Sequence, residues 1–352
     1  MPATQPNAIF QKAAEMGASD VHIAVGVPVT FRVNDVLTPV TKGALTEADV
    51  KKIVRSVLGE SAWKQFERDR EIDVSHTVGN SVRLRVNCHF ERGVPSLAAR
   101  IIPNAIPTLE EVGLGDAFAP ILELTEGLIL FTGPAGVGKS TSMAAVIGEI
   151  RKRRSLNIVT LEDPIEFVFP REGEGVVRQR QCGEDFLTFA EALRRVLRQD
   201  PDVVMVGEMR DLETIAATLT LAETGHLVFG TLHTPNAMQT IDRIVDVFPP
   251  HQQAQVRSQL SLSLRAIVSQ RLLPKEGGGL TALRELLINT AAVGHIIREN
   301  RTTELQTVLQ TGTKDGMSTF EADAKRLRKE GVISADTLKL ALELTAKVSK
   351  RA

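Results

Sequence analysis

Residues 133–140 constrain the fold of this 352-residue chain more than any other segment. They read Gly-Pro-Ala-Gly-Val-Gly-Lys-Ser, which matches the pattern G-x-x-x-x-G-K-[ST] without a gap. Glycines let the backbone curl so that successive N–H groups point at phosphate oxygens, and a helix that starts at the lysine adds its positive end. An apolar run at 128–131 precedes the segment, and a helical pattern at about 139–150 follows it. A chance glycine-rich turn predicts no such context, so we expect a nucleotide-binding loop.

The polar residues of this loop have distinct expected tasks. Lys139 supplies a positive charge for the β- and γ-phosphates of ATP, and the hydroxyl of Ser140 supplies a ligand for Mg²⁺. We expect the Lys139 side chain to face solvent when no nucleotide is bound. The predicted ATP-binding residues are Gly133, Pro134, Ala135, Gly136, Val137, Gly138, Lys139, Ser140 and Thr141.

The chain after residue 117 has the pattern of an α/β domain. Continuous apolar strands that alternate with helices indicate a parallel sheet covered on both faces. From Pro249 onward the pattern is mainly helical, apart from three glycines at 277–279 and an apparent strand at 280–288. The short apolar runs that carry the sheet prediction are 128–131, 158–161, 203–206 and 227–230.

The first hundred residues have a different pattern, in which alternating apolar and polar residues predict half-buried strands beside helices. This is typical of a mixed α+β domain. Pro103, Pro107 and glycines within 113–115 then interrupt the chain. We therefore predict an N-terminal domain at 1–103, a linker at 104–117, an ATPase core at 118–275 and a mainly helical C-terminal region at 276–352.

Acidic residues come directly after two of the apolar runs. Glu162 and Asp163 follow 158–161, and Glu208 follows 203–206. Carboxyl ends of parallel strands face the ligand crevice, so these side chains should point toward phosphate and metal. An apolar strand that ends in a carboxylate has the Walker B layout, although Gly207 stands where aspartate is common.

We expect these carboxylates to act on the attacking water and to bind the metal ion. We expect Glu162 to polarise the attacking water, and we expect Ser140, Asp163 and Glu208 to hold Mg²⁺, partly through water. The pattern leaves open which glutamate is the general base. Asp211 is better interpreted as a helix N-cap, because aspartate is favoured at that position.

Histidines and arginines complete the candidate site. His226 and His233 bracket the apolar run at 227–230, where a histidine taken alone is more often structural than catalytic. A phosphoryl transition state needs cations beyond the loop lysine, and these often come from a neighbouring subunit. The candidates for such a trans or sensor arginine are Arg83, Arg195 and Arg210, and the sequence does not choose among them.

Composition narrows the function class. The net charge of −1 argues against a whole-molecule basic field for nucleic acid, and 4% aromatic residues argue against stacking platforms for single strands. Cys88 and Cys182 cannot make a four-thiolate zinc site. Apolar runs stay well below the roughly 18 residues of a membrane span, and the start lacks the pattern of a signal peptide. We expect a soluble, cytoplasmic protein without an integral membrane segment.

The motifs taken together resemble those of the secretion ATPases of type IV pilus and type II secretion systems, and within them the PilT pilus-retraction ATPases. The similarity also includes Ala18-Ser-Asp-Val-His22 and the Gly-Glu-Met-Arg-Asp form of Walker B, in which Gly207 is expected. Because several motifs occur in the right order, the resemblance is specific. They are the loop at 133–141, an Asp box at 161–167, Walker B at 202–211 and a His box at 224–234.

The resemblance implies a RecA-like P-loop ATPase domain, a smaller PAS-like α+β N-terminal domain and a helical C-terminal region. It implies a hexameric ring with nucleotide between the two domains, in which His226 and His233 sense the γ-phosphate. The implied function is a Mg²⁺-dependent ATPase motor for pilus retraction and twitching motility. The implied partners at the cytoplasmic face of the inner membrane are a pilus platform protein and, as an option, a paralogous retraction ATPase.

One segment of the chain differs from the retraction ATPases that the chain resembles. Residues 292–299 have Gly294 and His295 where the retraction ATPases usually have Arg and Asn.

The sequence leaves three alternative functions. A pilus-extension or type II secretion ATPase usually carries a tetracysteine zinc module and an extra N-terminal domain. A RecA-like nucleic-acid translocase should have basic or aromatic-lined segments. A non-hydrolysing regulatory subunit is at odds with the intact Lys139, Glu162 and Glu208.

Overall fold

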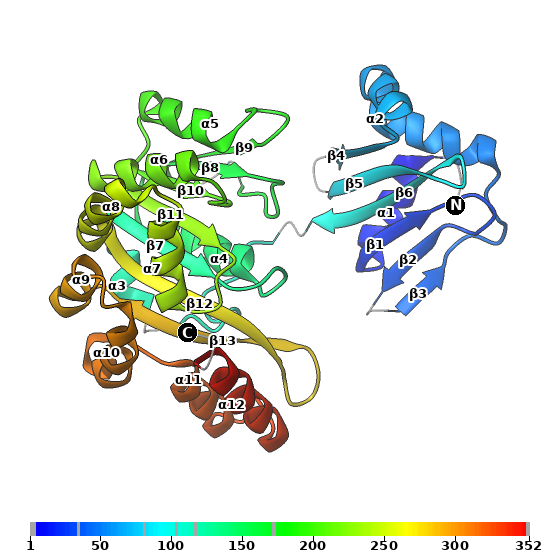
Figure 1. Ribbon diagram of the computed structural model, residues 1–352. Helices are drawn as coiled ribbons and strands as arrows, with labels where there is room; N and C mark the ends of the chain where they lie inside the picture. The colour runs from blue at the N-terminus through cyan, green and yellow to red at the C-terminus, as the bar shows by residue number, and fades with distance from the viewer. Residues whose placement is uncertain are drawn as a thin grey trace. The chain divides into compact units, whose positions relative to one another are not determined.

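The computed structural model describes residues 5–33, 36–79, 82–102, 105–115, 118–170 and 174–349 (Figure 1). The chain divides into two compact units. The first consists of Met1–Ala105 with Glu166–Val168, and the second of Ile106–Ile165 with Phe169–Ala352. Pro103 of the predicted boundary lies outside the described residues. The finer divisions predicted at 117 and 275 stay predictions.

The first unit is built around a six-stranded sheet in the order β3-β2-β1-β6-β5-β4, with every described pairing antiparallel. Alternation places Val82, Leu84 and Val86 in its core. Thr46 begins α2 with a capping box, in which its hydroxyl accepts from the Asp49 N–H. The elements are α1 (Pro6–Glu15), β1 (Ala18–Ile23), β2 (Thr30–Val33), β3 (Val36–Pro39), α2 (Glu47–Asp69), β4 (Glu71–Val78), β5 (Val82–Glu91) and β6 (Val94–Ile102).

The second unit contains a seven-stranded sheet in the order β13-β12-β7-β11-β10-β8-β9. Neighbouring strands run parallel except β12 and β13, which are antiparallel. Every residue of β7, β10 and β11 is buried, as expected for strands covered on both faces. The strands are β7 (Gly127–Thr132), β8 (Asn157–Glu162), β9 (Val176–Gln181), β10 (Val203–Val206), β11 (Leu227–Leu232), β12 (Leu264–Pro274) and β13 (Leu280–Ile288).

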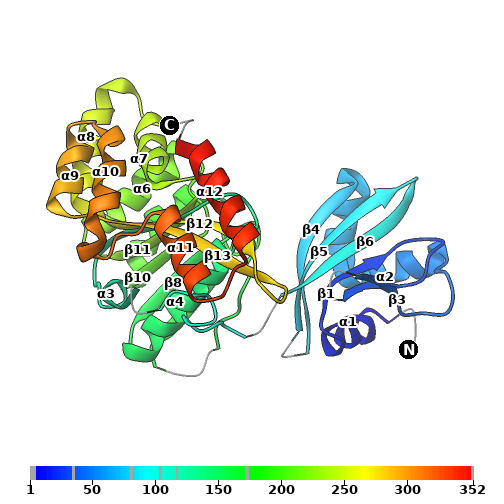
Figure 2. The same cartoon turned by 90° about the horizontal axis from the view of Figure 1, so that it is seen from below.

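Helices cover both faces of this sheet (Figures 1 and 2). The connection from β7 through α4 runs to β8, toward the β9 edge of the sheet, whereas the connections through α5, α6 and α7 run back toward the β13 edge. Because such connections are right-handed, α4 lies on the face of the sheet opposite the other three helices. The helices are α3 (Ala119–Leu122), α4 (Lys139–Arg153), α5 (Phe189–Val196), α6 (Leu212–Glu223), α7 (Ala237–Asp246), α8 (Pro250–Ser263), α9 (Ala291–Arg298), α10 (Leu305–Thr311), α11 (Phe320–Lys329) and α12 (Ala335–Ser349), with short 3₁₀ turns at Leu197–Gln199, Thr302–Glu304 and Gly312–Asp315.

The predicted parallel α/β sheet is confirmed, and β13 matches the strand predicted at 280–288. The pattern does not predict β12, which runs beside β7 in a stretch interpreted as helical. Its sequence, Leu-Arg-Ala-Ile-Val-Ser-Gln-Arg-Leu-Leu-Pro, mixes apolar and polar residues without strict alternation, so its period does not separate strand from helix. Among the described helices, none combines the length and apolarity that crossing a membrane requires.

Candidate functional site

The phosphate-binding loop joins the carboxyl end of β7 to α4, as predicted. Gly133, Gly136 and Gly138 all have positive φ, at 137°, 77° and 83°, a region that favours glycine. At Gly133 the space is also restricted, because a Cβ atom there would lie 2.4 Å from the carbonyl oxygen of Gln270 on β12. The loop therefore needs glycine at this position for two independent reasons.

The expectation that Lys139 faces solvent is wrong. Its side chain is 8% exposed, and its ammonium donates to the carbonyl oxygens of Gly133 at 2.7 Å and Pro134 at 2.9 Å. Carbonyl dipoles attract the cation, and the loop curls around it. The positive charge that we expect to bind phosphate is therefore bound to carbonyl oxygens of its own loop.

His233 connects Lys139 with the Walker B glutamate. The Lys139 Nζ lies 3.5 Å from His233 Nδ1, and His233 Nε2 lies 3.1 Å from Glu208 Oε1. Because an ammonium can only donate, Nδ1 is assigned as the acceptor, which leaves the proton on Nε2 to be donated to the carboxylate. Arg210 pairs with the same carboxylate. The result is a continuous polar path from the loop to the end of β10.

Glu162 lies at the end of β8 and is 5% exposed. Its Oε1 accepts from Thr160 Oγ1 at 2.6 Å and from Gln179 Nε2 at 3.1 Å. Gln179 is on the edge strand β9, and no motif in the sequence indicates its role. The carboxylate is thus already oriented by two neighbours.

Gly207 lets the ends of β8 and β10 approach each other. Its N–H donates to Leu161 O at 2.7 Å, and its own carbonyl accepts from the Thr231 hydroxyl. A Cβ atom on Gly207 would lie 3.0 Å from Leu161 O and 3.2 Å from the Cα of Glu162. The aspartate common in other Walker B motifs would therefore crowd the backbone here, which gives a physical reason for glycine.

The other predicted metal ligands lie near this edge of the sheet. Ser140 is half-buried in the first turn of α4, and Asp163 is exposed directly after β8. The pKa of Arg210 is raised mainly by its bond to Glu208 and further by the charge of Asp163, which places the Asp163 carboxylate in the neighbourhood of that pair. Among the described residues, no group of three or more His, Cys, Asp or Glu side chains could hold a metal ion.

The structure does not bring His226 to the loop. This residue precedes β11, and its Nδ1 lies 3.1 Å from Leu221 O and 3.2 Å from the Thr224 hydroxyl at the end of α6. The phosphate-binding loop lies at the other end of the sheet, about 20 Å away along a six-residue strand. A catalytic role for His226 stays a prediction.

The candidate arginines occupy different places. Arg210 is beside Glu208, whereas the exposed Arg195 pairs with Glu191 on α5. Arg83 lies on β5 of the first unit. Their roles toward phosphate stay predictions. Asp211 caps α6 as expected, since it accepts from the backbone N–H of Thr214 at 2.9 Å.

Loop geometry leads to a stability prediction. We expect Gly133→Ala to lower the free energy of unfolding by at least about 3 kcal/mol and to weaken nucleotide binding, because its Cβ overlaps a backbone oxygen. Gly136→Ala is the matched control. It has positive φ and no atom within 4 Å of a Cβ, so it should cost only about 1 kcal/mol. Thermal melting with and without ATP measures both, and equal melting temperatures would contradict the prediction.

A glycine-curled loop with its lysine, facing carboxylates at the carboxyl edge of a parallel sheet, defines a P-loop ATPase. The family model described as "Type II/IV secretion system protein" matches residues 3–278. The chain belongs to this family of secretion ATPases, and it is an ATPase that binds nucleotide.

Individual relatives cover nearly the whole chain. The chain is 43% identical over 324 residues to the type IV pilus retraction ATPase PilT of Pseudomonas aeruginosa, with 92% of this chain and 94% of that protein covered. It is 42% identical over 320 residues to a twitching motility protein of Neisseria gonorrhoeae, covering 91% and 85%. The crystal structure of the pilus retraction motor PilT with bound ADP matches at a TM-score of 0.88 and 43% identity, covering 95% and 96%. These likenesses confirm the predicted family and fold class.

Proposed function

We propose that this chain is the subunit of a motor that uses ATP hydrolysis to retract type IV pili and so drives twitching motility. The observation that carries the proposal is the similarity to a retraction ATPase over 94% of its length, since it includes both units and the complete loop. The polar path Lys139–His233–Glu208 supports the hydrolytic part.

In this proposal, Lys139 exchanges its bonds to the loop carbonyls for bonds to phosphate oxygens. His233 then loses its contact with the lysine while it keeps Glu208, so its ring is placed to respond to an occupied site. Glu162 and Glu208 are the two candidates for the general base, since each carboxylate already accepts from two neighbours: Glu162 from Thr160 and Gln179, and Glu208 from His233 and Arg210. The glutamate that is not the base orients the network around the water.

Magnesium fits the residues at this edge. Mg²⁺ prefers oxygen ligands, keeps several waters and is commonly held by one or two protein groups plus phosphates. The hydroxyl of Ser140 and the carboxylates of Asp163 and Glu208 offer such ligands, and no dedicated protein cage is needed. When bound, the ion would neutralise charge on the β- and γ-phosphates.

The proposed assembly is a hexameric ring at the cytoplasmic face of the inner membrane, docked on a pilus platform protein. A paralogous retraction ATPase is a further proposed partner. Gly294 lies in α9 against α8, where a Cβ atom would be 3.3 Å from Ser261 O. The glycine that replaces the usual arginine at position 294 thus lies where α9 packs closely on α8. We include in the proposal that the segment 292–299 couples ATP hydrolysis to retraction.

Assembly leads to a concentration prediction. We expect specific ATPase activity to fall on dilution, because a cation supplied across an interface contributes ~10³–10⁵ in rate in other nucleotide hydrolases. The candidates are Arg83, Arg195 and Arg210. Light scattering at each dilution gives the mass of the active species. Constant specific activity in a monomeric fraction would refute the trans cation.

Deletion of the gene in the source organism tests the direction of the motor. Cells that keep abundant surface pili but lose twitching support retraction, whereas cells without pili indicate an extension ATPase. Complementation with the unaltered chain and with Lys139→Ala separates loss of ATP hydrolysis from loss of the protein.

A further inference from the structure

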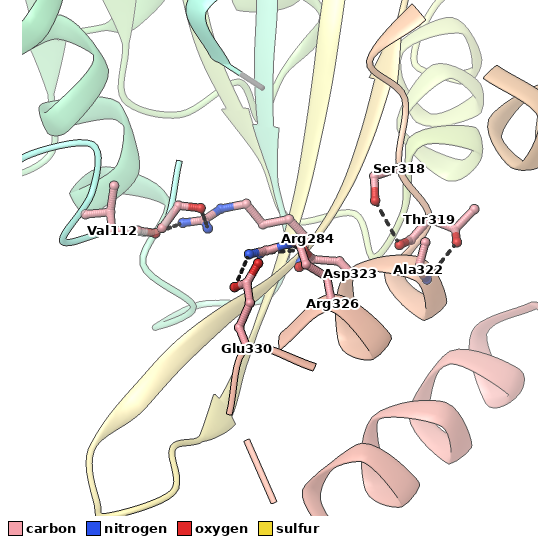
Figure 3. A network of polar contacts seen from close by, with 9 residues as sticks. Val112, Arg284, Ser318, Thr319, Ala322, Asp323, Arg326 and Glu330 are labelled. Carbon is pink, nitrogen blue, oxygen red and sulfur yellow. Dashed lines mark hydrogen bonds and ion pairs between the residues drawn. The ribbon is translucent and has the colours of Figure 1, made fainter. Parts of the chain in front are cut away.

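Strand β13 carries two adjacent charged residues whose side chains leave on opposite faces, Arg284 and Glu285. Arg284 is buried, and its guanidinium donates to Gly113 O at 3.0 Å and to the Ser142 hydroxyl of α4 at 3.1 Å. Its backbone N–H donates to Asp323 Oδ2 at 2.8 Å. Figure 3 shows this side chain reaching toward Val112 while Asp323 and Arg326 lie beside the strand. These contacts fasten β13 to the phosphate-loop helix and to α11.

Glu285 makes the corresponding contact on the other face. One of its carboxylate oxygens, Oε1, accepts the backbone N–H of Ala237 at 2.9 Å. Ala237 is the first residue of α7, and Asn236 caps the same helix by accepting from the Gln239 N–H at 2.8 Å. The N–H groups of a first helical turn have no partner within the helix, so an acceptor from another strand fixes where α7 begins.

His233 lies between the end of β11 and the start of α7. Only residues 234–236 separate His233 from the helix, and the Thr234 hydroxyl bonds to that of Thr240 within α7 at 2.7 Å. The connection is therefore short and tied to the helix. We expect a displacement of Ala237 to change the position of His233, which β11 holds from one side and α7 from the other.

Charged residues from several elements line the cavity beside Glu285. Glu285 lines this cavity of about 940 Å³ together with Asn236, Phe320 and residues 316–319. Arg271 on β12 contributes a positive charge, and further charged residues of the cavity wall are Arg284, Glu321, Asp323, Lys325 and Arg326. Burial raises the pKa of Glu285 to about 7, against the bond from Ala237 and the charge of Arg271, which lower it.

We propose that Glu285 is a positioning residue of the ATPase site, which holds the start of α7 and thereby keeps His233 between Lys139 and Glu208. The inference deepens the proposed function, because it rests on the role of His233 proposed there. Glu285 itself contacts none of the reacting atoms. Its effect passes through one backbone hydrogen bond and a short loop.

Three variants of the protein test this proposal. Glu285→Ala removes the acceptor, and we expect kcat to fall at least tenfold while the dissociation constant for ATP, measured by fluorescence titration, changes less than twofold. Glu285→Gln keeps an oxygen that can accept from Ala237 and should retain most of kcat at pH 8. Glu321→Gln is the matched control, since Glu321 lines the same cavity and pairs with Lys325 on the surface. Unchanged kcat in Glu285→Ala, or equal loss in all three variants, would overturn the proposal.

The pH dependence of kcat distinguishes titration of Glu285 from a general loss of structure in the variant. As pH falls through about 7, Glu285 takes up a proton and its carboxyl becomes a weaker acceptor. We expect the ratio of kcat in the unaltered protein to kcat in Glu285→Gln to fall between pH 8 and pH 6. A constant ratio contradicts titration of Glu285 as the cause.

The free energy of unfolding should depend on pH in the opposite direction to kcat. The folded protein holds the proton up to about pH 7, whereas the unfolded chain releases it near 4.5, so stability falls as pH rises through this window. Glu285→Gln should therefore melt at a higher temperature than the unaltered protein at pH 8 and at the same temperature at pH 4. A difference that does not depend on pH would overturn the placement of this carboxyl.

A direct probe separates this inference from the function itself. NMR of protein labelled with ¹⁵N-histidine follows the ring of His233, assigned by comparison with His233→Ala. We expect its signals to shift in Glu285→Ala and to be preserved in Glu321→Gln. If pili retract normally without this protein, the proposed function fails while the His233 shift still stands. An unchanged His233 signal in folded Glu285→Ala refutes the positioning role.

Discussion

Replacing Lys139 with alanine is expected to lower ATP turnover by at least about 10²-fold, because a positioned charge on the transferring phosphoryl group is lost. The structure adds a second effect. Without the ammonium, the carbonyl oxygens of Gly133 and Pro134 lose their donor, so the free energy of unfolding should fall by about 1–3 kcal/mol. Phosphate release and thermal melting of the purified variant measure the two effects.

The matched control for this variant is Lys152→Ala. Lys152 lies on the same helix, is exposed and pairs with Glu149. An exposed pair of this kind contributes little to stability, so both turnover and melting temperature should stay close to those of the unaltered protein. Undiminished ATP turnover in Lys139→Ala would reject the site.

The second large effect on ATP hydrolysis is expected for Glu208→Gln. We expect ATP binding to be kept and hydrolysis to slow by about 10²-fold or more, since the change preserves shape and removes the charge that accepts from His233 and Arg210. Steady-state phosphate release and ATP titration separate turnover from binding. Normal hydrolysis by this variant would remove Glu208 from the mechanism.

Glu162→Gln is the companion variant that separates the two glutamates. Its amide can still accept from Thr160, although the side chain no longer carries charge. If Glu208 is the general base, Glu162→Gln should be the less impaired of the two. The reverse order would assign the base to Glu162.

The sequence alone predicts the loop, the parallel sheet and the carboxylates at the carboxyl ends of β8 and β10. These features depend on local signals, such as the glycines of the loop and the continuous apolar runs, and the structure preserves them. The Asp211 cap is equally local, because the residue bonds to Thr214 in its own first turn.

Other features depend on contacts between distant segments, which no local pattern contains. Lys139 turns inward because its own loop offers carbonyl oxygens, and β12 is a strand because β7 and β13 pair with it. Glu285 reaches Ala237 across 48 positions, so its sequence neighbourhood does not indicate a role at the site.

The inward-turned lysine has a consequence for the cycle of such an enzyme. Gly133 O and Pro134 O act as tethered competitors of phosphate, since arriving nucleotide must break both bonds before the ammonium is free. The same bonds re-form when product leaves and so offset part of the interaction that departing phosphate gives up. We therefore expect these bonds to weaken nucleotide affinity, which suits an enzyme that must release its product before each new round of hydrolysis.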